Sequence, residues 1–170
     1  LSGTLPAEMS SMTSTTTLDL SDNRDLEGWL FDWSTMNDIT SFKINGARIS
    51  GTLPDGLGNF IHLTTLDLGG NELSGTIPTQ VGSMVDLQTL DLSDNEFSGV
   101  LPAGMLSNTQ VIKDIYLHRN DLEGPVADML AGIQNKHLVH DLTLAYNDFT
   151  GPIPPELALF TTLRELDLSH

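Results

Sequence analysis

The stretch KDIYLHRN (113–120) contains side chains that could do chemistry. His118 lies close in sequence to Asp114, and a second pair, His140 with Asp141, follows in a similar stretch. Two imidazoles with two carboxylates could bind a metal ion or act as an acid–base pair. The alternative is four separately solvated side chains, because an open surface has no walls that exclude water and fix the geometry.

The sequence motifs of common catalytic sites are missing. The chain contains no nucleophile elbow, no phosphate-binding loop and no HExxH motif. The glycine-rich stretches SGTLP and SGTIP recur with a fixed period, which a dedicated phosphate loop would not do. The sequence therefore predicts that the protein is not an enzyme and has neither catalytic residues nor a bound cofactor.

Charge and composition limit the partners that the chain can bind. Its 170 residues include 7 Lys or Arg and 23 Asp or Glu, which give a formal net charge of −16. Nucleic acids and anionic membrane surfaces both attract clustered basic residues, so this balance argues against them and favours a cationic or neutral polar partner. There is no cysteine, and no apolar run approaches the roughly 20 residues of a membrane span. We therefore expect no direct membrane insertion of this segment.

Two short motifs alternate along the whole chain at intervals of about 24 to 27 residues. Copies of the first motif are LDLSDN (18–23), FKINGA (42–47), LDLGGN (66–71), LDLSDN (90–95), IYLHRN (115–120) and LTLAYN (142–147). Copies of the second are LSGTLP (1–6), LEGWLF (26–31), ISGTLP (49–54), LSGTIP (73–78), FSGVLP (97–102), LEGPVA (122–127) and FTGPIP (149–154). A repeat of this length predicts a solenoid, because one copy cannot bury its apolar face alone.

The paired motifs resemble the leucine-rich repeat family, in particular the plant-type subclass whose repeats read LxxLxLxxNxLSGxIP. The resemblance covers essentially the whole chain. It implies a solenoid with a parallel β-sheet on the concave side, irregular or 3-10 return segments on the convex side and a right-handed superhelix. We expect one domain over residues 1–170 with about seven repeats, truncated within a repeat at both ends.

The alternation of apolar and polar residues in LxxLxLxxN predicts a short strand in each repeat. The apolar positions should form the core: Leu18, Leu20, Phe42, Ile44, Leu66, Leu68, Leu90, Leu92, Ile115, Leu117, Leu142, Leu144, Leu166 and Leu168. A further apolar column is predicted to fill the core from the return side: Met12, Met36, Phe60, Met84 and Phe160. Helix is expected only as short 3-10 turns on that side.

An asparagine closes most copies of the first motif. Its amide should turn inward and bond backbone groups of its own coil and a neighbouring one. The predicted structural ladder consists of Asn23, Asn71, Asn95, Asn120 and Asn147, and Ala47 interrupts it.

Two repeats depart from the template. In the second, Trp29, Phe31 and Trp33 replace the proline region, and in the sixth the residues AGIQNKH (131–137) are extra. The glycine and polar residues of this extra stretch favour a loop that bulges on the convex or edge side.

In leucine-rich repeat proteins the concave face usually contacts the partner. Here the outward strand positions are short and polar in repeats one to four, whereas repeats five to seven add large aromatic and basic side chains, together with three histidines that include His170. The candidate partner-binding residues are Tyr116, His118, Arg119, His140, Tyr146 and Arg164. Tyrosine and arginine are favoured interface anchors, and histidine protonation predicts that binding changes between about pH 5 and 7. The alternative is repeat drift on a solvated face.

The central outward position of each repeat forms a second pattern. In order it reads Asp19, Lys43, Asp67, Asp91, Tyr116, Thr143 and Asp167. Lys43 is predicted to pair with a neighbouring carboxylate. Asp67 and Asp91 should lie side by side, which makes them a candidate weak Ca²⁺ site, although Ca²⁺ prefers six to eight oxygens. Beyond this pair the sequence predicts no metal site.

The resemblance implies a non-catalytic protein- or glycan-recognition module at the cell surface or outside the cell. A second interpretation is a structural or scaffold component of a cell-surface or multi-subunit assembly. A third is ice binding, for which the outward threonines form a partial array that fails in repeats five and six: Thr16, Thr17, Thr64, Thr65 and Thr89. The chain lacks cysteine pairs and Asn-x-Ser/Thr sequons, which argues against a land-plant receptor. We expect a fragment of a larger protist or algal surface or secreted protein.

Overall fold

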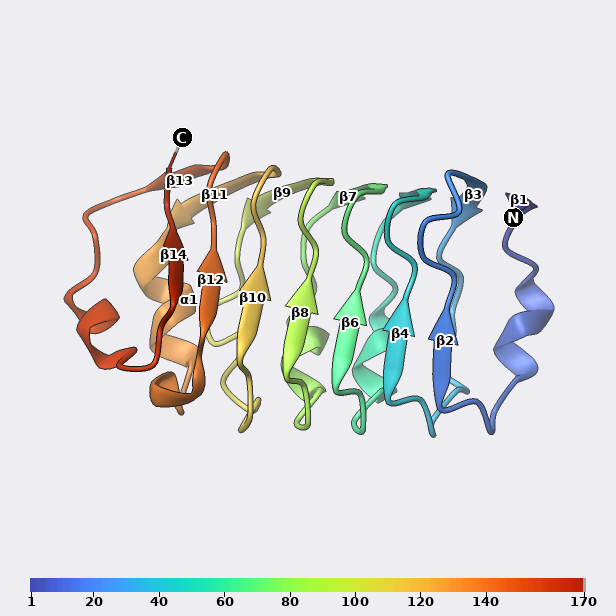
Figure 1. Ribbon diagram of the computed structural model, residues 1–170, viewed down its shortest axis with the longest axis horizontal. Helices are drawn as coiled ribbons and strands as arrows, with labels where there is room; N and C mark the ends of the chain where they lie inside the picture. Colours follow the sequence, from blue (N-terminus) through green and yellow to red (C-terminus); the bar gives the residue numbers. More distant parts are fainter. Residues whose placement is uncertain (170) are drawn as a thin grey trace.

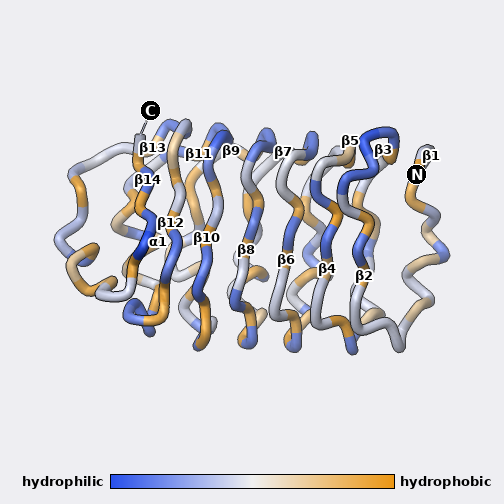
Figure 2. Tube along the Cα trace, viewed as in Figure 1, coloured by the Kyte–Doolittle hydropathy of each residue, from blue (hydrophilic) through white to orange (hydrophobic). Residues whose placement is uncertain are grey.

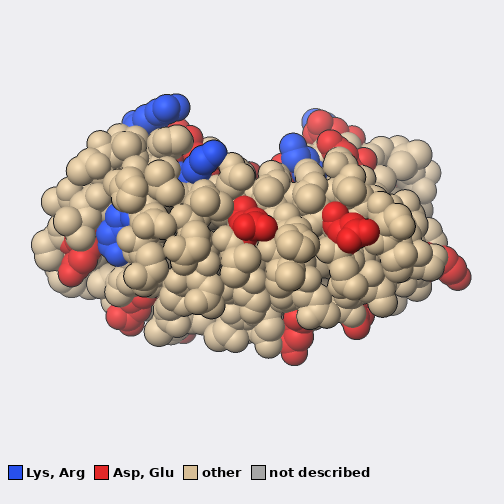
Figure 3. Space-filling model, turned by 90° about the horizontal axis from the view of Figure 1, so that it is seen from below, with Lys and Arg blue, Asp and Glu red and all other residues tan. Residues whose placement is uncertain are grey.

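The computed structural model describes residues 1–169 and shows a row of stacked coils, each contributing strands to two parallel sheets (Figure 1). His170 lies outside the described residues. Figure 2 shows hydrophobic and hydrophilic stretches recurring at corresponding places in successive coils. Seen from below, the molecule is hollowed along its upper outline, and charged side chains are scattered over an otherwise uncharged surface (Figure 3).

The concave sheet is formed by the LxxLxLxxN segments, as the alternation predicts. Over residues 1–169 it has seven strands: β2 (Thr17–Asp19), β4 (Ser41–Lys43), β6 (Thr65–Asp67), β8 (Thr89–Asp91), β10 (Asp114–Tyr116), β12 (Asp141–Thr143) and β14 (Glu165–Asp167). All are parallel and follow one another in chain order, so each coil adds one strand beside the last. The predicted leucine-rich repeat solenoid with a parallel concave sheet is confirmed.

The second sheet was not predicted. Within the described residues it also has seven strands: β1 (Ser2–Thr4), β3 (Asp25–Trp29), β5 (Arg48–Gly51), β7 (Glu72–Gly75), β9 (Glu96–Val100), β11 (Asp121–Pro125) and β13 (Asp148–Thr150). These are the Leu-x-Gly segments, whose glycines are more typical of turns. Gly75 has φ +77, and a Cβ there would lie 3.0 Å from Thr52 Cγ2, so glycine permits this close approach between coils.

The return side is mostly 3-10 helix, at Ala7–Ser11, Asp55–Asn59, Thr79–Ser83, Lys136–Leu138 and Pro155–Leu159. The expectation of 3-10 turns alone was wrong for the sixth repeat, where α1 (Val126–Gly132) is an α-helix. Good helix formers follow Pro125, and Met129 and Leu130 are buried in the core. The predicted loop at 131–137 is therefore partly helical: its first two residues end α1, and its last two belong to a 3-10 turn.

The core runs continuously between the sheets and the return helices. Nine of the fourteen predicted strand residues, from Phe42 to Leu142, are fully inaccessible, and Leu18 and Leu144 are also buried. Leu20 and Leu168 are only partly buried, and Leu166 is 44% exposed. Met12, in the first coil, is 41% exposed, in contrast to the other members of its column. These residues lie in the outermost described coils, which have a neighbour on one side only, so half of their packing is missing.

The two tryptophans of the irregular second repeat have opposite environments. Trp33 is 1% exposed, stacks on Phe31 with ring centroids 4.8 Å apart and meets Phe42 edge-on at the same distance. Trp29 is 68% exposed at the end of β3. One tryptophan therefore belongs to the core, whereas the other contributes little to it.

The ladder asparagines join successive coils. Asn71 Nδ2 donates to the carbonyl oxygens of Ile44 in the preceding coil at 2.6 Å and Leu68 in its own coil at 2.9 Å, and Asn71 Oδ1 accepts the Ile49 N–H at 3.1 Å. The same pattern recurs at Asn95, Asn120 and Asn147. Asn23 bonds carbonyls of its own coil only, at Leu20 and Ser21.

Candidate binding surface

The strand register brings the central outward residues into one column across the concave sheet. Asp19 lies opposite Lys43, Lys43 opposite Asp67, and Asp67 opposite Asp91. The column continues through Tyr116, Thr143 and Asp167 in β10, β12 and β14. The predicted order of this column is confirmed.

A tight turn follows each concave strand, and its backbone constrains the residue before the ladder position. Gly46 and Gly70 have φ +63 and +66 there, in the left-handed region. Arg119 and Tyr146 occupy the same position in repeats five and six, with φ +55 each. Bulky residues avoid this conformation, which costs an L-residue other than glycine about 1–2 kcal/mol. The large side chains at this edge are therefore held at an energetic cost to the fold.

Arg119 and Tyr146 contact each other across adjacent coils. The Arg119 guanidinium carbon lies 5.2 Å from the centre of the Tyr146 ring, within cation–π range. Arg119 Nε is also 3.7 Å from Asp94 Oδ1. Both side chains remain largely exposed, so the pair offers a flat ring and a guanidinium to a partner.

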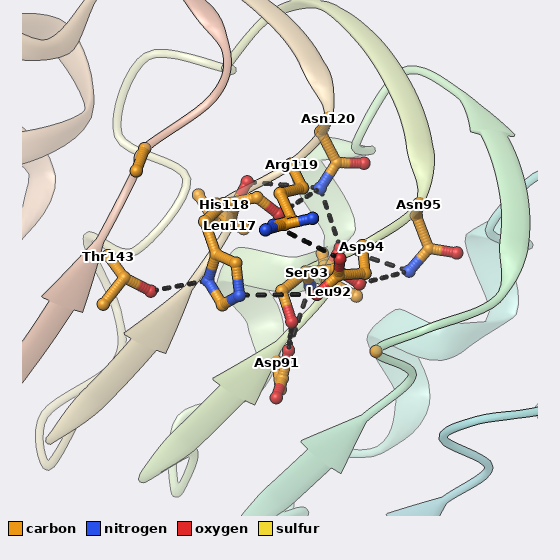
Figure 4. Close-up of polar contacts among 12 residues, drawn as sticks. Asp91, Leu92, Ser93, Asp94, Asn95, Leu117, His118, Arg119, Asn120 and Thr143 are labelled. Atoms are coloured by element: carbon orange, nitrogen blue, oxygen red, sulfur yellow. Dashed lines mark hydrogen bonds and ion pairs between the residues drawn. The ribbon is translucent and has the colours of Figure 1, made fainter. Parts of the chain in front are cut away.

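His118 is fixed from both sides (Figure 4). Its Nδ1 lies 2.8 Å from Thr143 Oγ1, and its Nε2 lies 3.4 Å from Asp94 Oδ2. Asp94 therefore faces both His118 and Arg119. We call these five residues, Asp94, His118, Arg119, Thr143 and Tyr146, the Arg119–Tyr146 cluster.

Tyr116 lies beside this cluster in β10. Its hydroxyl donates to Asp141 Oδ2 at 3.1 Å. Burial and the nearby carboxylates of Asp141 and Asp114 raise the pKa of the Tyr116 hydroxyl. The hydroxyl therefore stays protonated and holds the ring in place between strands.

His140 and Arg164 do not join this cluster. They precede β12 and β14, and the backbone places His140 next to Lys113 and Arg164 next to His140. Tyr146 lies six residues further along the chain, in the turn beyond the C-terminal end of β12. His140 and Arg164 therefore lie at the N-terminal ends of the concave strands, Arg119 and Tyr146 lie beyond the C-terminal ends, and Tyr116 lies between them.

The suggested His118–His140 pair is absent for the same reason, since His118 aligns with Ala145 rather than with His140. Within residues 1–169 no group of three or more histidine, aspartate or glutamate side chains could hold a metal ion.

Asp67 and Asp91 lie opposite each other, as predicted. Burial, followed by the Asp91 charge, raises the pKa of Asp67, while hydrogen bonds from Asn45 Nδ2 at 2.5 Å and the Gly69 N–H at 3.3 Å oppose the shift. Asp91 accepts from the hydroxyl and the N–H of Ser93 instead. The predicted Lys43 ion pair is wrong: among the described residues Lys43 forms no ion pair. Its charge still acts on both neighbours, since it contributes to the lowered pKa of Asp19 and opposes the rise in the pKa of Asp67.

The sequence pattern places Thr143 in the outward column but assigns no role to Thr143 or Asp94, and it does not show the strained backbone at Arg119 and Tyr146. Gly46 and Gly70 at the equivalent position are the signal that could have shown it.

Comparisons with known proteins agree with this geometry. Residues 61–122 match the family model described as leucine rich repeat, whereas no curated protein matches the chain. The fold is that of a leucine-rich repeat solenoid, and the repeats are consistent with the plant-type subclass. None of the helices formed by residues 1–169 has the length and apolarity that a membrane-spanning segment needs.

Three similar solved structures come from plants. One is the ectodomain of the Arabidopsis thaliana membrane receptor kinase GASSHO1/SCHENGEN3 in complex with CASPARIAN STRIP INTEGRITY FACTOR 2, with 28% identity and a TM-score of 0.85 over 96% of this chain and 20% of that one. Another is the Arabidopsis receptor kinase HAESA in complex with the peptide hormone IDA and the co-receptor SERK1, with 27% identity and a TM-score of 0.89 over 99% of this chain and 28% of that one.

The third is a plant ice-binding protein, with 25% identity and a TM-score of 0.80 over 100% of this chain and 61% of that one. The chain therefore spans less than two thirds of each of these three proteins.

Proposed function

We propose that the chain is a non-catalytic recognition module that binds a protein partner, through the Arg119–Tyr146 cluster and Tyr116, at the cell surface or outside the cell. The observation that carries the proposal is the left-handed backbone of Arg119 and Tyr146. Drift on a solvated face would favour glycine, asparagine or aspartate at such positions, as in repeats one to four. Strained residues that persist are a signal of function.

The chemistry of the cluster suits a protein partner. Tyrosine and arginine are enriched at the energetic centres of interfaces, and a guanidinium binds carboxylates in a bidentate manner. The GASSHO1/SCHENGEN3 ectodomain was solved in complex with CASPARIAN STRIP INTEGRITY FACTOR 2, and HAESA in complex with the peptide hormone IDA. His140 and Arg164 lie too far away to share one small contact and would serve a longer partner.

The test is a double variant, Tyr116→Asp with Arg119→Asp, which installs the aspartates found at these positions in repeat four. Both side chains point away from the core, so far-UV circular dichroism should show the wild-type fold. Immobilised wild type, double variant and the control Thr65→Ala are compared for capture of extracellular proteins by quantitative mass spectrometry. We expect at least one protein to be captured by wild type and control and to be lost about tenfold or more by the double variant.

Equal capture by all three would refute the assignment of this surface. Self-association of the chain in size-exclusion chromatography, unaffected by the double variant, would instead favour a scaffold role.

Ice binding is a second candidate because of the similarity to a plant ice-binding protein. On the concave sheet Thr17, Ser41, Thr65 and Thr89 lie in one row, but Asp114 and Asp141 continue it. Charged residues interrupt the small hydroxyl array there. We expect no thermal hysteresis, and hysteresis that Thr65→Ala reduces would favour this function instead.

A further inference from the structure

Trp29 is a large aromatic side chain that lies on the surface and does not belong to the core. The residue that follows the motif glycine in the other coils is smaller: Thr4, Thr52, Thr76, Val100, Pro125 and Pro152. Trp29 is 68% exposed, whereas Trp33, the other tryptophan of the chain, is 1% exposed. An exposed tryptophan offers both a large apolar face and an N–H donor, which is why this residue favours binding surfaces.

Trp29 borders a groove on the second sheet, away from the concave strands. The groove has a volume of about 470 Å³. Two cross-strand rows line it: Trp29, Ser50 and Glu72 in one, and Thr4, Glu27 and Arg48 in the other. Since neighbouring strands are about 4.8 Å apart, each row of three spans about 10 Å. The groove is therefore an elongated shallow site with an aromatic residue in one row.

The charged groups of this groove are not used by the fold. Glu27 lies opposite Arg48 in the strand register. Within residues 1–169, however, Glu27, Arg48 and Glu72 make neither an ion pair nor a side-chain hydrogen bond. Ser50 Oγ donates to the Gly28 carbonyl at 3.2 Å and keeps its acceptor capacity. The groove thus combines free acceptors and free donors with an exposed aromatic ring.

We propose that this groove binds a neutral oligosaccharide. A sugar hydroxyl both donates and accepts hydrogen bonds, which matches carboxylates beside a guanidinium and an indole N–H. The apolar face of a pyranose ring can stack on Trp29, whose burial supplies the apolar contribution.

The charge of the groove decides against other ligands. Glu27 and Glu72 against Arg48 leave a net negative groove on a chain of net charge −16, which disfavours an anionic sugar. Arg48 repels a positive charge placed directly beside it, and a lysine-rich peptide is therefore included in the test as the competing ligand.

The two tryptophans make the proposal directly measurable. The full chain is titrated with cellohexaose, xylohexaose, laminarihexaose and mannohexaose into the millimolar range, while tryptophan emission is recorded. We expect a saturable change with at least one of these sugars. Trp29→Thr, which installs the residue of neighbouring coils, should abolish that change and leave the emission of the buried Trp33. By calorimetry its affinity should fall at least about tenfold, whereas Trp29→Tyr keeps a ring and should retain most of the binding.

Matched controls separate this site from the rest of the molecule. Glu72→Gln should weaken binding, while Glu96→Gln, an exposed glutamate at the equivalent position of the next strand, should not. The Tyr116→Asp, Arg119→Asp variant should bind the sugar normally, because the proposal is independent of the concave face. The proposal is overturned if none of the four sugars gives a saturable change, or if Trp29→Thr binds them equally well. Tighter binding of a lysine-rich peptide or of polygalacturonate than of every neutral sugar would overturn it as well.

Discussion

Replacing Asn95 by alanine tests how the coils are joined. Its Nδ2 donates to the carbonyl oxygens of Leu68 at 2.9 Å, Leu92 at 3.2 Å and Ser93 at 2.9 Å, and its Oδ1 accepts the Leu73 N–H at 3.0 Å. Counting each bond at about 1 kcal/mol would predict a loss of about 4 kcal/mol. That count is too high, because the four backbone groups do not depend equally on Asn95.

The three carbonyl oxygens each keep another donor in the variant. These donors are Asn71 Nδ2 for Leu68, Asn120 Nδ2 for Leu92 and the Gly70 N–H for Ser93, each at 2.9 Å. Only the N–H of Leu73, a fully buried residue, loses its partner. One buried donor without a partner costs about 1–3 kcal/mol. We therefore expect Asn95→Ala to lower the free energy of unfolding by this amount, or roughly 2–4 °C in melting temperature per kcal/mol.

Ala47→Asn is the complementary change. Asn95 accepts the N–H of Leu73, which begins the second motif of the preceding repeat, and Leu26 is the equivalent residue for position 47. The Leu26 N–H already donates to the Asn23 carbonyl oxygen at 2.8 Å. An asparagine at position 47 would therefore find little that is unsatisfied, and we expect a change between zero and about 1 kcal/mol of stabilisation.

Urea unfolding followed by circular dichroism, with equal slopes for all variants, measures both changes. A loss above about 4 kcal/mol for Asn95→Ala would refute the argument from shared carbonyls. The register of the ladder would be wrong if Ala47→Asn destabilised more than Asn95→Ala.

The remaining predictions concern the concave face. Burial and the Asp91 charge raise the pKa of Asp67 in the folded state, so the ionised carboxylate destabilises the fold as the pH rises through that pKa. Asp67→Asn should therefore increase the free energy of unfolding at pH 7. Below about pH 3.9, where the carboxyl is protonated in both states, it should change that free energy little. Asp19→Asn is the control of opposite sign, because hydrogen bonds from Ser21 lower the pKa of Asp19. The Asp19 carboxylate therefore stabilises the fold at pH 7, and this stabilisation is lost as the pH falls through the lowered pKa. Thermal melts of both variants across pH 2–8 make the comparison. Arg119→Asn should raise the free energy of unfolding by up to about 1 kcal/mol in urea titrations while it reduces partner capture, and unchanged stability would argue against backbone strain. Calorimetry with millimolar Ca²⁺ should show no heat, because Asp67 and Asp91 supply too few oxygens, and saturable heat that Asp67→Asn removes would establish a site there.

The concave sheet could be predicted because one pattern determines both its strands and their register. Leu66 and Leu68 must both face inward, and a shift of one residue would expose them. The second sheet has no such pattern: in ELSG (72–75) only Leu73 is apolar, and Gly75 resembles a turn residue. That strand exists because strands of neighbouring coils pair with it, which is information from outside the segment.

The candidate site could be predicted in composition but not in arrangement. Tyr116, His118 and Arg119 were identified by departure from the template. Their split from His140 follows from strand direction, and the role of Asp94 follows from the turn geometry. The exposed Trp29 and the buried Trp33 are four residues apart in an irregular repeat, where the template gives no guidance about which one enters the core.

The shared carbonyl oxygens of the ladder have a consequence for how such a chain can change over evolutionary time. Losing one asparagine is tolerable, as Ala47 illustrates. The Leu20 carbonyl oxygen still accepts a hydrogen bond from the Asn23 amide, and the Ile44 carbonyl oxygen still accepts one from the Asn71 amide. Losing two consecutive asparagines is a different event: without Asn71 and Asn95 the Leu68 carbonyl would have neither of its amide donors. Gaps in the ladder can therefore accumulate singly but not side by side, so mutational robustness depends on the spacing of the gaps as well as on their number.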